Sequence, residues 1–472
     1  MIRWLLFALM YATTVAAQST ALERLNRLLA DDFFQRATVG VAVYDLTEQK
    51  TLFVHNEKRL CRPASNMKLL TSAAALSVLT PEYSFKTGVY HTGYVNDSGR
   101  LLGDVYLVGG FDPELKSADL DKLIVQIKNA GIRSIEGSLY LDATMADTIH
   151  WGKAWSWDDD MEAFQPYLSP IPLNKGVVRL RVAPTATGSA PTVRTEPVSS
   201  FIQVENRATT VARSAEPPRT TLRFSRDFVD RRNLITVSGT IPASANAYET
   251  FITLKNPRGY ALTIFAEKMS EQFPGSNISV AGTMRVPANA QNLGYVANSM
   301  IDVLKPLNKD SDNLNAEMFL YALGYQQDGE PSSTEKGIAV VQQFMEQIGY
   351  PSTAYRMVDG SGLSNQNYLT PEMMVDVLKY MYRSPHFEPF RQSLPIAGVD
   401  GTLINRMRNT AAHRRVTAKT GSLTSVSALS GYATARNGNI LAFSIMIQNF
   451  VERTANVAVN YVDRICVAIS EF

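Results

Sequence analysis

The 472-residue chain has little cysteine, little histidine and no strong excess of charge. Its two cysteines, Cys61 and Cys466, are too few for a disulfide scaffold, and the sequence leaves open whether they pair or stay buried and free. The formal net charge is +2 and basic residues do not cluster with aromatic ones, so nucleic-acid binding is not expected. The five histidines lack the spacing of metal ligands, so a zinc peptidase is not predicted.

Long apolar runs are absent after the N-terminus, and no later segment reaches the roughly 18 apolar residues of a membrane span. The first residues differ, because Arg3 is followed by an apolar run at 4–10 and by small residues at 15–17. This pattern predicts a secretory signal peptide over residues 1–17 that is cleaved on export to the periplasm. An N-terminal anchor is the alternative, but the run is short for one. The apolar face of residues 454–469 favours core packing, with at most peripheral membrane contact.

The pattern of predicted secondary structure changes twice along the chain. Its composition, 45% hydrophobic and 19% charged, is ordinary for a globular protein, and its length suggests two to four domains. Short strand-like runs dominate residues 87–255, with one helix expected near 117–130. Longer helical patterns return after residue 256, and two apolar strands at 427–433 and 440–448 flank an Asn-Gly turn.

The first candidate motif is Ser-x-x-Lys at Ser65 and Lys68, where an alanine-rich helix begins. A spacing of three on a helix puts both side chains on one face. Burial and a second nearby cation both push a lysine toward its neutral form, which can take the serine proton. Ser65 and Lys68 are therefore a candidate nucleophile and base.

Two further motifs lie downstream. Ser311 and Asn313 form Ser-x-Asn, which offers a hydroxyl for proton relay and an amide for a substrate carbonyl or for Lys68. Lys419-Thr420-Gly421 offers a cation and a hydroxyl for a substrate carboxylate, and Gly421 is expected to let a substrate backbone come close. Lys419 would also be the second cation near Lys68.

Each motif occurs twice, so no single copy decides the assignment. The second copies are at 333–336, 244–246 and 86–88. A helix cap, a turn or a surface strand is the expected role of an isolated copy. Ser333 follows a Gly- and Pro-containing turn and is expected to be an N-cap, whereas the helix after Ser65 is suited to burial. Context and order therefore select Ser65.

The order Ser-x-x-Lys, Ser-x-Asn, Lys-Thr-Gly resembles that of the penicillin-binding proteins and serine β-lactamases. With 242 residues between Lys68 and Ser311, the chain is similar more particularly to the D-alanyl-D-alanine carboxypeptidase/endopeptidase family of class C low-molecular-mass penicillin-binding proteins. The resemblance covers nearly all of the mature chain, and its other family-like stretches are 62–69, 155–160, 359–364, 401–403 and 419–423.

Two positions depart from the family pattern. Phe111 precedes Asp112-Pro113 where the family usually has glycine. The tryptophan segment at 155–160 carries one aspartate more than expected, which leaves open which of its acids faces the substrate: Asp158, Asp159 or Asp160. Neither departure touches the three catalytic motifs.

The resemblance implies an α/β (α+β) fold with a transpeptidase-like domain, in which helices flank an antiparallel sheet. That domain is expected to be split into residues 18–86 and 256–472 by a β-rich insertion at 87–255, expected to form two small domains. The implied catalytic residues are Ser65, Lys68, Ser311, Asn313 and Lys419. The implied substrate-binding residues are Thr420, Gly421 and Ser422, with an oxyanion hole at the backbone N–H groups of Ser65 and Ser422. No metal or organic cofactor is implied.

The implied function is that of a serine D-alanyl-D-alanine carboxypeptidase and/or endopeptidase that acts on peptidoglycan stem peptides ending in D-Ala-D-Ala. The reaction would pass through an acyl-enzyme on Ser65, and β-lactams would inhibit it. A serine β-lactamase is one alternative, although the long insertion argues against it, and a catalytically silent peptidoglycan-binding protein is another. A Ser-His-Asp hydrolase is disfavoured because no Gly-x-Ser-x-Gly elbow occurs. Carboxypeptidase against endopeptidase preference and oligomeric state stay open.

Overall fold

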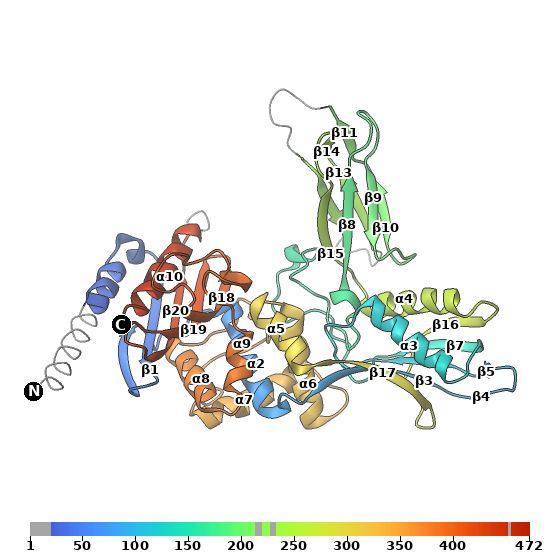
Figure 1. Ribbon diagram of the computed structural model, residues 1–472, viewed down its shortest axis with the longest axis horizontal. Coiled ribbons are helices and arrows are strands. Elements are labelled where there is room, and N and C mark those ends of the chain that lie inside the picture. Colours follow the sequence, from blue (N-terminus) through green and yellow to red (C-terminus); the bar gives the residue numbers. More distant parts are fainter. Residues whose placement is uncertain (1–19, 213–219, 227–232, 452–454) are drawn as a thin grey trace, which may run out of the picture. The chain divides into compact units, whose positions relative to one another are not determined.

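The computed structural model describes residues 20–212, 220–226, 233–451 and 455–472 (Figure 1). The predicted signal peptide at 1–17 lies outside these residues. The chain divides into two compact units. Unit 1 comprises Met1–Tyr83, Gly152–Trp155 and Ser299–Phe472, and unit 2 comprises Ser84–Trp151 and Ser156–Asn298.

Unit 1 is built on a five-stranded antiparallel sheet in the order β18-β19-β20-β1-β2. Its strands are β1 (Thr38–Asp45), β2 (Lys50–His55), β18 (Val416–Leu423), β19 (Val426–Thr434) and β20 (Ile440–Gln448). The predicted Asn-Gly turn joins β19 to β20, and Gly438 has the positive φ (+90°) that such a turn requires. β19 and β20 are buried along nearly their whole length, which explains their continuous apolar sequences.

Helices cover both faces of this sheet (Figure 1). Residues 20–29 and α10 (Ala455–Ile469) share one apolar core with alternate residues of β1, such as Val39 and Val41. Gly40 points to the opposite face, where a Cβ would meet Pro371 of α8 (Pro371–Arg383). The other helices of unit 1 are η1 (Asp32–Gln35), η2 (Ala64–Asn66), α2 (Met67–Leu79), α5 (Met300–Lys309), α6 (Asn313–Asp328), α7 (Thr334–Ile348), α9 (Phe387–Ser393) and η5 (Gly401–Leu403).

The alanine-rich helix α2 lies at the centre of unit 1. It contacts α5, α6, α7, α8 and α9, and it is buried at all positions except Ser77 and Val78. Small alanine side chains let neighbouring helices approach closely, and alanine also favours the helix itself. The motif at Ser65 is therefore anchored on a rigid element.

Unit 2 contains a seven-stranded sheet and three smaller ones. The larger sheet has the order β17-β3-β6-β7-β5-β4, with β16 pairing parallel to β7. Its strands are β3 (Ser84–His91), β4 (Tyr94–Val95), β5 (Arg100–Leu102), β6 (Val105–Val108), β7 (Ser134–Asp142), β16 (Asn277–Thr283) and β17 (Gln291–Ser299). Helices α3 (Ser117–Asn129) and α4 (Pro257–Gln272) pack against each other and against strands of this sheet.

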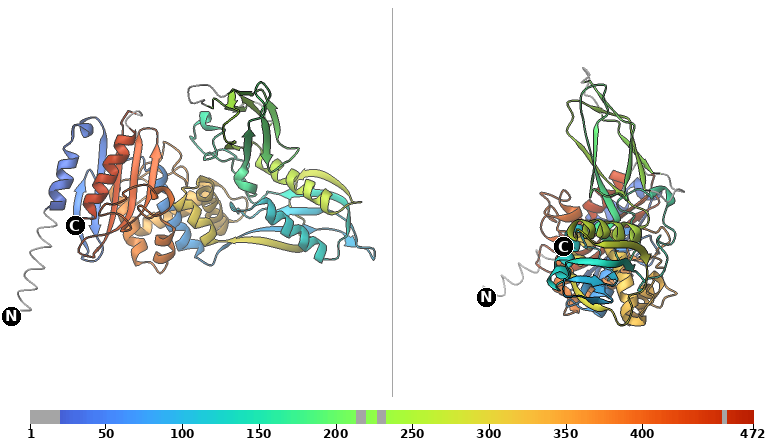
Figure 2. Two further views of the ribbon diagram at one scale, coloured as in Figure 1. Left: turned by 45° about the horizontal axis from the view of Figure 1, so that its top comes forward. Right: turned by 90° about the vertical axis from the view of Figure 1, so that its right-hand side faces the viewer.

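The smaller sheets of unit 2 have the orders β15-β8-β9, β10-β13-β12 and β11-β14, and Figure 2 shows their strands side by side. These strands are β8 (Val177–Ala183), β9 (Thr192–Glu196), β10 (Gln203–Asn206), β11 (Thr209–Val211), β12 (Arg223–Arg226), β13 (Leu234–Ser238), β14 (Thr240–Pro242) and β15 (Tyr248–Thr253). Two short 3-10 helices, η3 (Trp157–Asp159) and η4 (Leu173–Gly176), precede them.

One predicted boundary differs from the structure. The insertion was expected to end at residue 255, but α4, β16 and most of β17 belong to unit 2, which ends at Asn298. The physical reason is the core: Tyr260 and Phe265 of α4 pack in one apolar cluster with Leu139 of β7 and Val178 of β8. Because longer helical patterns were expected only in the transpeptidase-like domain, the helical pattern of α4 was assigned to that domain. Because one cluster spans the larger and smaller sheets, separate folding of two small domains stays a prediction.

The two cysteines are both buried and free. Cys61 lies just before η2, while Cys466 lies in α10. Among the described residues, no helix combines the length and the apolar character needed to cross a bilayer.

Candidate active site

Ser65 lies in the 3-10 turn η2, directly before α2, and its side chain is only partly buried. The preceding residue, Ala64, has a positive φ of +48°, which is strained for a residue with a Cβ. Asn66 fixes the turn from the other side, since its Nδ2 donates to Ser430 Oγ of β19 at 2.7 Å. The sequence predicted that a helix opens at Ser65; the structure instead begins the α-helix two residues later and leaves the serine in a strained turn.

Lys68 is fully buried and meets three oxygen atoms. Its Nζ lies 3.0 Å from Ser65 Oγ, 2.5 Å from Asn313 Oδ1 and 2.7 Å from the Ser361 carbonyl oxygen. The amide oxygen and the carbonyl oxygen can only accept hydrogen bonds. In a neutral amine they take the two N–H groups, so the lone pair of Nζ points at the Ser65 hydroxyl.

Burial lowers the pKa of Lys68 to about 8, against the opposing effect of carboxylates at Asp359, Glu317 and Asp312. A lysine of ordinary pKa would be almost entirely protonated at neutral pH. A fraction of about one tenth is neutral at pH 7 when the pKa is near 8. The structure therefore places a lysine with a lowered pKa within hydrogen-bond reach of Ser65.

Lys419 and Ser311 form a second polar pair. Lys419 Nζ donates to Ser311 Oγ at 2.8 Å and to the Thr420 carbonyl at 2.9 Å. Burial lowers the pKa of Lys419 well below its ordinary value, and the charge of Lys68 lowers it further. Ser311 has a positive φ of +63° and immediately precedes Asp312, which caps α6. The second and third motifs thus meet directly.

β18, which carries the third motif, is an edge strand of the sheet. Thr420 Oγ1 donates to Thr402 Oγ1 of η5 at 2.8 Å, and Ser422 is exposed near the end of the strand. Thr402 was not among the predicted site residues, although 401–403 was one of the family-like stretches.

Gly421 of the third motif packs closely against the turn that carries Ser65. A Cβ at Gly421 would lie 2.7 Å from the Pro63 carbonyl oxygen and 3.2 Å from Asn66 Oδ1. Residue 421 is buried against the turn that carries Ser65. The missing side chain thus lets β18 approach that turn, and the approach of a substrate backbone at Gly421 stays a prediction.

A further loop, 359–364, lies against Lys68. It was one of the family-like stretches, with no role in the site predicted for it. Gly362 has a φ of +80°, and a Cβ there would lie 1.8 Å from the Ala64 carbonyl oxygen. Asp359 is buried and accepts hydrogen bonds from within the loop and from Trp155. Glu317 is also buried and accepts from the loop backbone. The spacing of Glu317 four residues after Asn313 was the one sequence signal for it.

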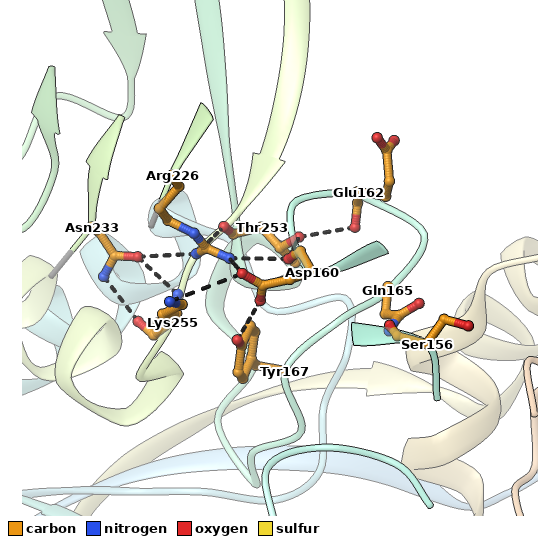
Figure 3. Close-up of polar contacts among 9 residues, drawn as sticks. All are labelled: Ser156, Asp160, Glu162, Gln165, Tyr167, Arg226, Asn233, Thr253 and Lys255. Atoms are coloured by element: carbon orange, nitrogen blue, oxygen red, sulfur yellow. Dashed lines mark hydrogen bonds and ion pairs between the residues drawn. The ribbon is translucent and has the colours of Figure 1, made fainter. Parts of the chain in front are cut away.

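Of the three adjacent aspartates at 158–160, Asp160 is the one whose side chain is held by other residues of unit 2 (Figure 3). Asp160 is buried in unit 2, where Arg226 Nη2 lies 3.0 Å and Lys255 Nζ 3.9 Å from its Oδ2, and Tyr167 donates to its Oδ1. The carboxylate of Asp160 is therefore paired with groups inside unit 2 rather than directed at a ligand. Asp158 is exposed and Asp159 is partly exposed, so these two remain the candidates for contact with a ligand.

The second copies of the motifs have structural roles. Ser333 is the N-cap of α7 and accepts from the Lys336 N–H at 3.2 Å, as predicted. The copy at 86–88 lies within β3 of unit 2, and the copy at 244–246 follows β14. Among the described residues, no group of three or more His, Cys, Asp or Glu side chains is arranged to hold a metal ion.

Comparison with known proteins places the chain in a family. Residues 21–465 match the D-Ala-D-Ala carboxypeptidase 3 (S13) family. A D-alanyl-D-alanine carboxypeptidase of Actinomadura sp. (strain R39) is 32% identical over 468 residues, which cover 95% of this chain and 84% of that protein. The D-alanyl-D-alanine carboxypeptidase DacB of Haemophilus influenzae is 26% identical over 420 residues, covering 88% and 86% of the two chains.

The fold agrees with a solved structure. The crystal structure of penicillin binding protein 4 from Haemophilus influenzae superposes with a TM-score of 0.81 and 23% identity, covering 95% of this chain and 99% of that one. At this identity the likeness establishes the fold, including the predicted mixture of a helix-flanked antiparallel sheet and a β-rich insertion. The family match over nearly the whole chain adds the assignment: the protein belongs to the D-Ala-D-Ala carboxypeptidase 3 (S13) family.

Proposed function

We propose that this protein is a serine D-alanyl-D-alanine carboxypeptidase and/or endopeptidase that cleaves peptidoglycan stem peptides through an acyl-enzyme on Ser65. The observation that carries the proposal is the buried Lys68, whose Nζ lies 3.0 Å from Ser65 Oγ while two further acceptors fix its orientation. A nucleophile within hydrogen-bond reach of an oriented base is the arrangement that covalent acyl transfer needs.

Acylation begins when neutral Lys68 takes the proton of the Ser65 hydroxyl. Ser65 Oγ then forms a bond to the carbonyl carbon of the penultimate D-alanine, and the carbonyl oxygen becomes an oxyanion. The backbone N–H groups of Ser65 and Ser422 are the proposed donors to that oxyanion, and one such donor contributes roughly 3–4 kcal/mol to a transition state. The positive φ of Ala64 and the position of Ser422 near the end of β18 are compatible with this role.

The tetrahedral intermediate collapses by cleavage of the C–N bond to the terminal D-alanine. The leaving amine needs a proton, and Ser311, which is hydrogen-bonded to Lys419, is the proposed relay. It passes to the amine the proton that Lys68 took from Ser65, so Lys68 is neutral again when the acyl-enzyme has formed. Lys419, Thr420 and Ser422 are the proposed binding site for the terminal carboxylate of the substrate. Water then hydrolyses the ester on Ser65 and releases the shortened peptide. In an endopeptidase reaction the leaving amine belongs to a cross-linked neighbouring peptide.

Mass spectrometry of the mature protein with benzylpenicillin tests the nucleophile. We expect one penicilloyl group on Ser65 and none on Ser65→Ala. Ser333→Ala is the matched control, because it removes the serine of the other Ser-x-x-Lys copy, and it should label like the wild type. Labelling that persists in Ser65→Ala would overturn the proposal.

Two assays separate this function from its alternatives. Digestion of purified sacculi should remove pentapeptides if the protein is a carboxypeptidase and cross-linked dimers if it is an endopeptidase. Rapid turnover of nitrocefin without stable labelling would indicate a β-lactamase, and a labelled protein that leaves muropeptides intact would indicate a silent binding protein. Export to the periplasm by cleavage of residues 1–17 is part of the proposal and is tested by the N-terminal sequence of the protein recovered from cells.

A further inference from the structure

The loop at 359–364 lies beside Lys68 but belongs to none of the three motifs. The carbonyl oxygen of Ser361 accepts from Lys68 Nζ at 2.7 Å, and the carbonyl oxygen of Gly360 accepts from Thr71 Oγ1 at 2.7 Å. Lys68 and Thr71 both belong to α2. The loop therefore binds α2 through two successive carbonyl groups, one of which directs the base.

Asp359 organises this loop. Its Oδ1 accepts from the Gly362 N–H at 2.8 Å and from Asn367 Nδ2 at 2.7 Å. Its Oδ2 accepts from the Ser364 N–H at 2.6 Å and from Trp155 Nε1 at 2.9 Å. Four donors around one carboxyl group match an ionised carboxylate, which accepts on both oxygens and donates nothing. Only 1% of Asp359 is exposed, so this is a buried negative charge.

Glu317 supports the same loop from α6. Its Oε1 accepts from the Gly360 N–H at 3.1 Å and from the Ser361 N–H at 2.8 Å. Burial and the neighbouring Asp359 raise the pKa of Glu317 to about 8. Two carboxyl groups thus hold the loop, and the one with four donors is the better placed to carry the charge.

We propose that Asp359 is a positioning residue for Lys68: anchored by Trp155, it fixes the Ser361 carbonyl that orients the amine, and its buried negative charge sets how readily Lys68 becomes neutral. This inference rests on the proposed function of Ser65 and Lys68. It adds the loop at 359–364 to the three motifs as a fourth element of the catalytic apparatus.

The sign of the charge effect follows from the groups that face Lys68. Asp312 and Glu317 from α6 and Asp359 from the loop favour its ammonium form, and Asp359 has the largest such effect. The charge of Lys419 from β18 opposes that form. Because Asp359 also raises the pKa of Glu317, neutralising residue 359 alone would let Glu317 take up the negative charge. In a Glu317→Gln background, removing the charge at 359 therefore lowers the pKa of Lys68, and the neutral base becomes available at lower pH.

The test compares the pH dependence of acylation by a chromogenic cephalosporin in the Asp359→Asn/Glu317→Gln double variant and in Glu317→Gln alone. The midpoint of the rise with pH should move down by about one pH unit, the lower end of what a buried neighbouring charge causes. Thr71→Val is the matched control, because it removes a hydrogen bond to the same loop without altering charge. Its midpoint should stay at the wild-type value, even if its rate falls. A midpoint that is unmoved or raised in the double variant relative to Glu317→Gln overturns the inference.

Trp155→Phe provides a second arm if the double variant does not fold. It removes one donor to Asp359 and keeps an aromatic ring, so the acylation rate should fall several-fold with the midpoint unchanged. An unchanged rate in a folded Trp155→Phe protein contradicts the anchoring role. Failure of the wild type to label at Ser65 would instead refute the proposed function, so the two failures are distinguishable.

Discussion

Replacing Gly362 with alanine tests whether the loop at 359–364 sets the position of the nucleophile. The added Cβ would lie 1.8 Å from the Ala64 carbonyl oxygen and 2.4 Å from the Ala64 carbonyl carbon. Contacts shorter than 3.0 Å essentially never occur, so this separation must grow by more than 1 Å. The atoms that have to move are the backbone of the residue just before Ser65. A misplacement of about 1 Å can cost about 100-fold in rate.

We therefore expect Gly362→Ala to lower the rate of acylation by a chromogenic cephalosporin on the order of 100-fold, measured by stopped-flow. Gly349→Ala is the control, since Gly349 also has a positive φ (+103°) but no atom within 4 Å of its Cβ position. Both variants should lose roughly 1–2 kcal/mol of stability because a residue with a Cβ is strained at positive φ. Gly362→Ala should lose more through its clash, whereas Gly349→Ala should keep the wild-type rate. Equal rates in the two variants would refute the steric argument.

Two other predictions concern ionisation. The acylation rate of the wild type should rise with pH and level off above the pKa of Lys68, about 8, because only the neutral amine can take the Ser65 proton; a rate that falls between pH 6 and 8 contradicts this. Asp160→Asn should destabilise unit 2 by about 3 kcal/mol in chemical unfolding, since it leaves the buried guanidinium of Arg226 without its carboxylate. Glu205→Gln, which breaks an exposed pair, should cost less than about 1 kcal/mol, and similar losses in both variants would refute the burial argument.

The fold could be predicted where the sequence pattern is local. The apolar runs of β19 and β20 and the Asn-Gly turn between them are reproduced, as is the helix at α3. The end of the insertion could not be predicted in the same way. The pattern of α4 shows that it is a helix but not which core it joins, because its partners in β7 and β8 lie far away in sequence.

The three motifs of the site could be recognised because their residues are close together in sequence. The positions of Asp359, Glu317 and Trp155 beside the site could not be predicted, because they result from buried contacts between distant segments, although Trp155 and Asp359 lie in family-like stretches. An isolated Asp-Gly-Ser-Gly stretch is typical of a turn, and only the 2.7 Å contact from Ser361 to Lys68 gives that turn a second role. Gly421 shows the same limit, since the sequence indicated a close approach at this residue but not that its partner is Pro63.

The course of the chain links the insertion to this loop. Unit 2 is interrupted by Gly152–Trp155, four residues that return to unit 1 before the chain re-enters unit 2. Within those four residues, Trp155 is buried and donates to Asp359. A deletion of residues 84–298 would therefore remove a hydrogen-bond donor from the buried carboxylate beside Lys68. The segment between the first two motifs thus includes a residue, Trp155, that contacts the loop at 359–364. Loss of activity on removal of this segment would therefore not by itself identify a substrate-binding role for unit 2.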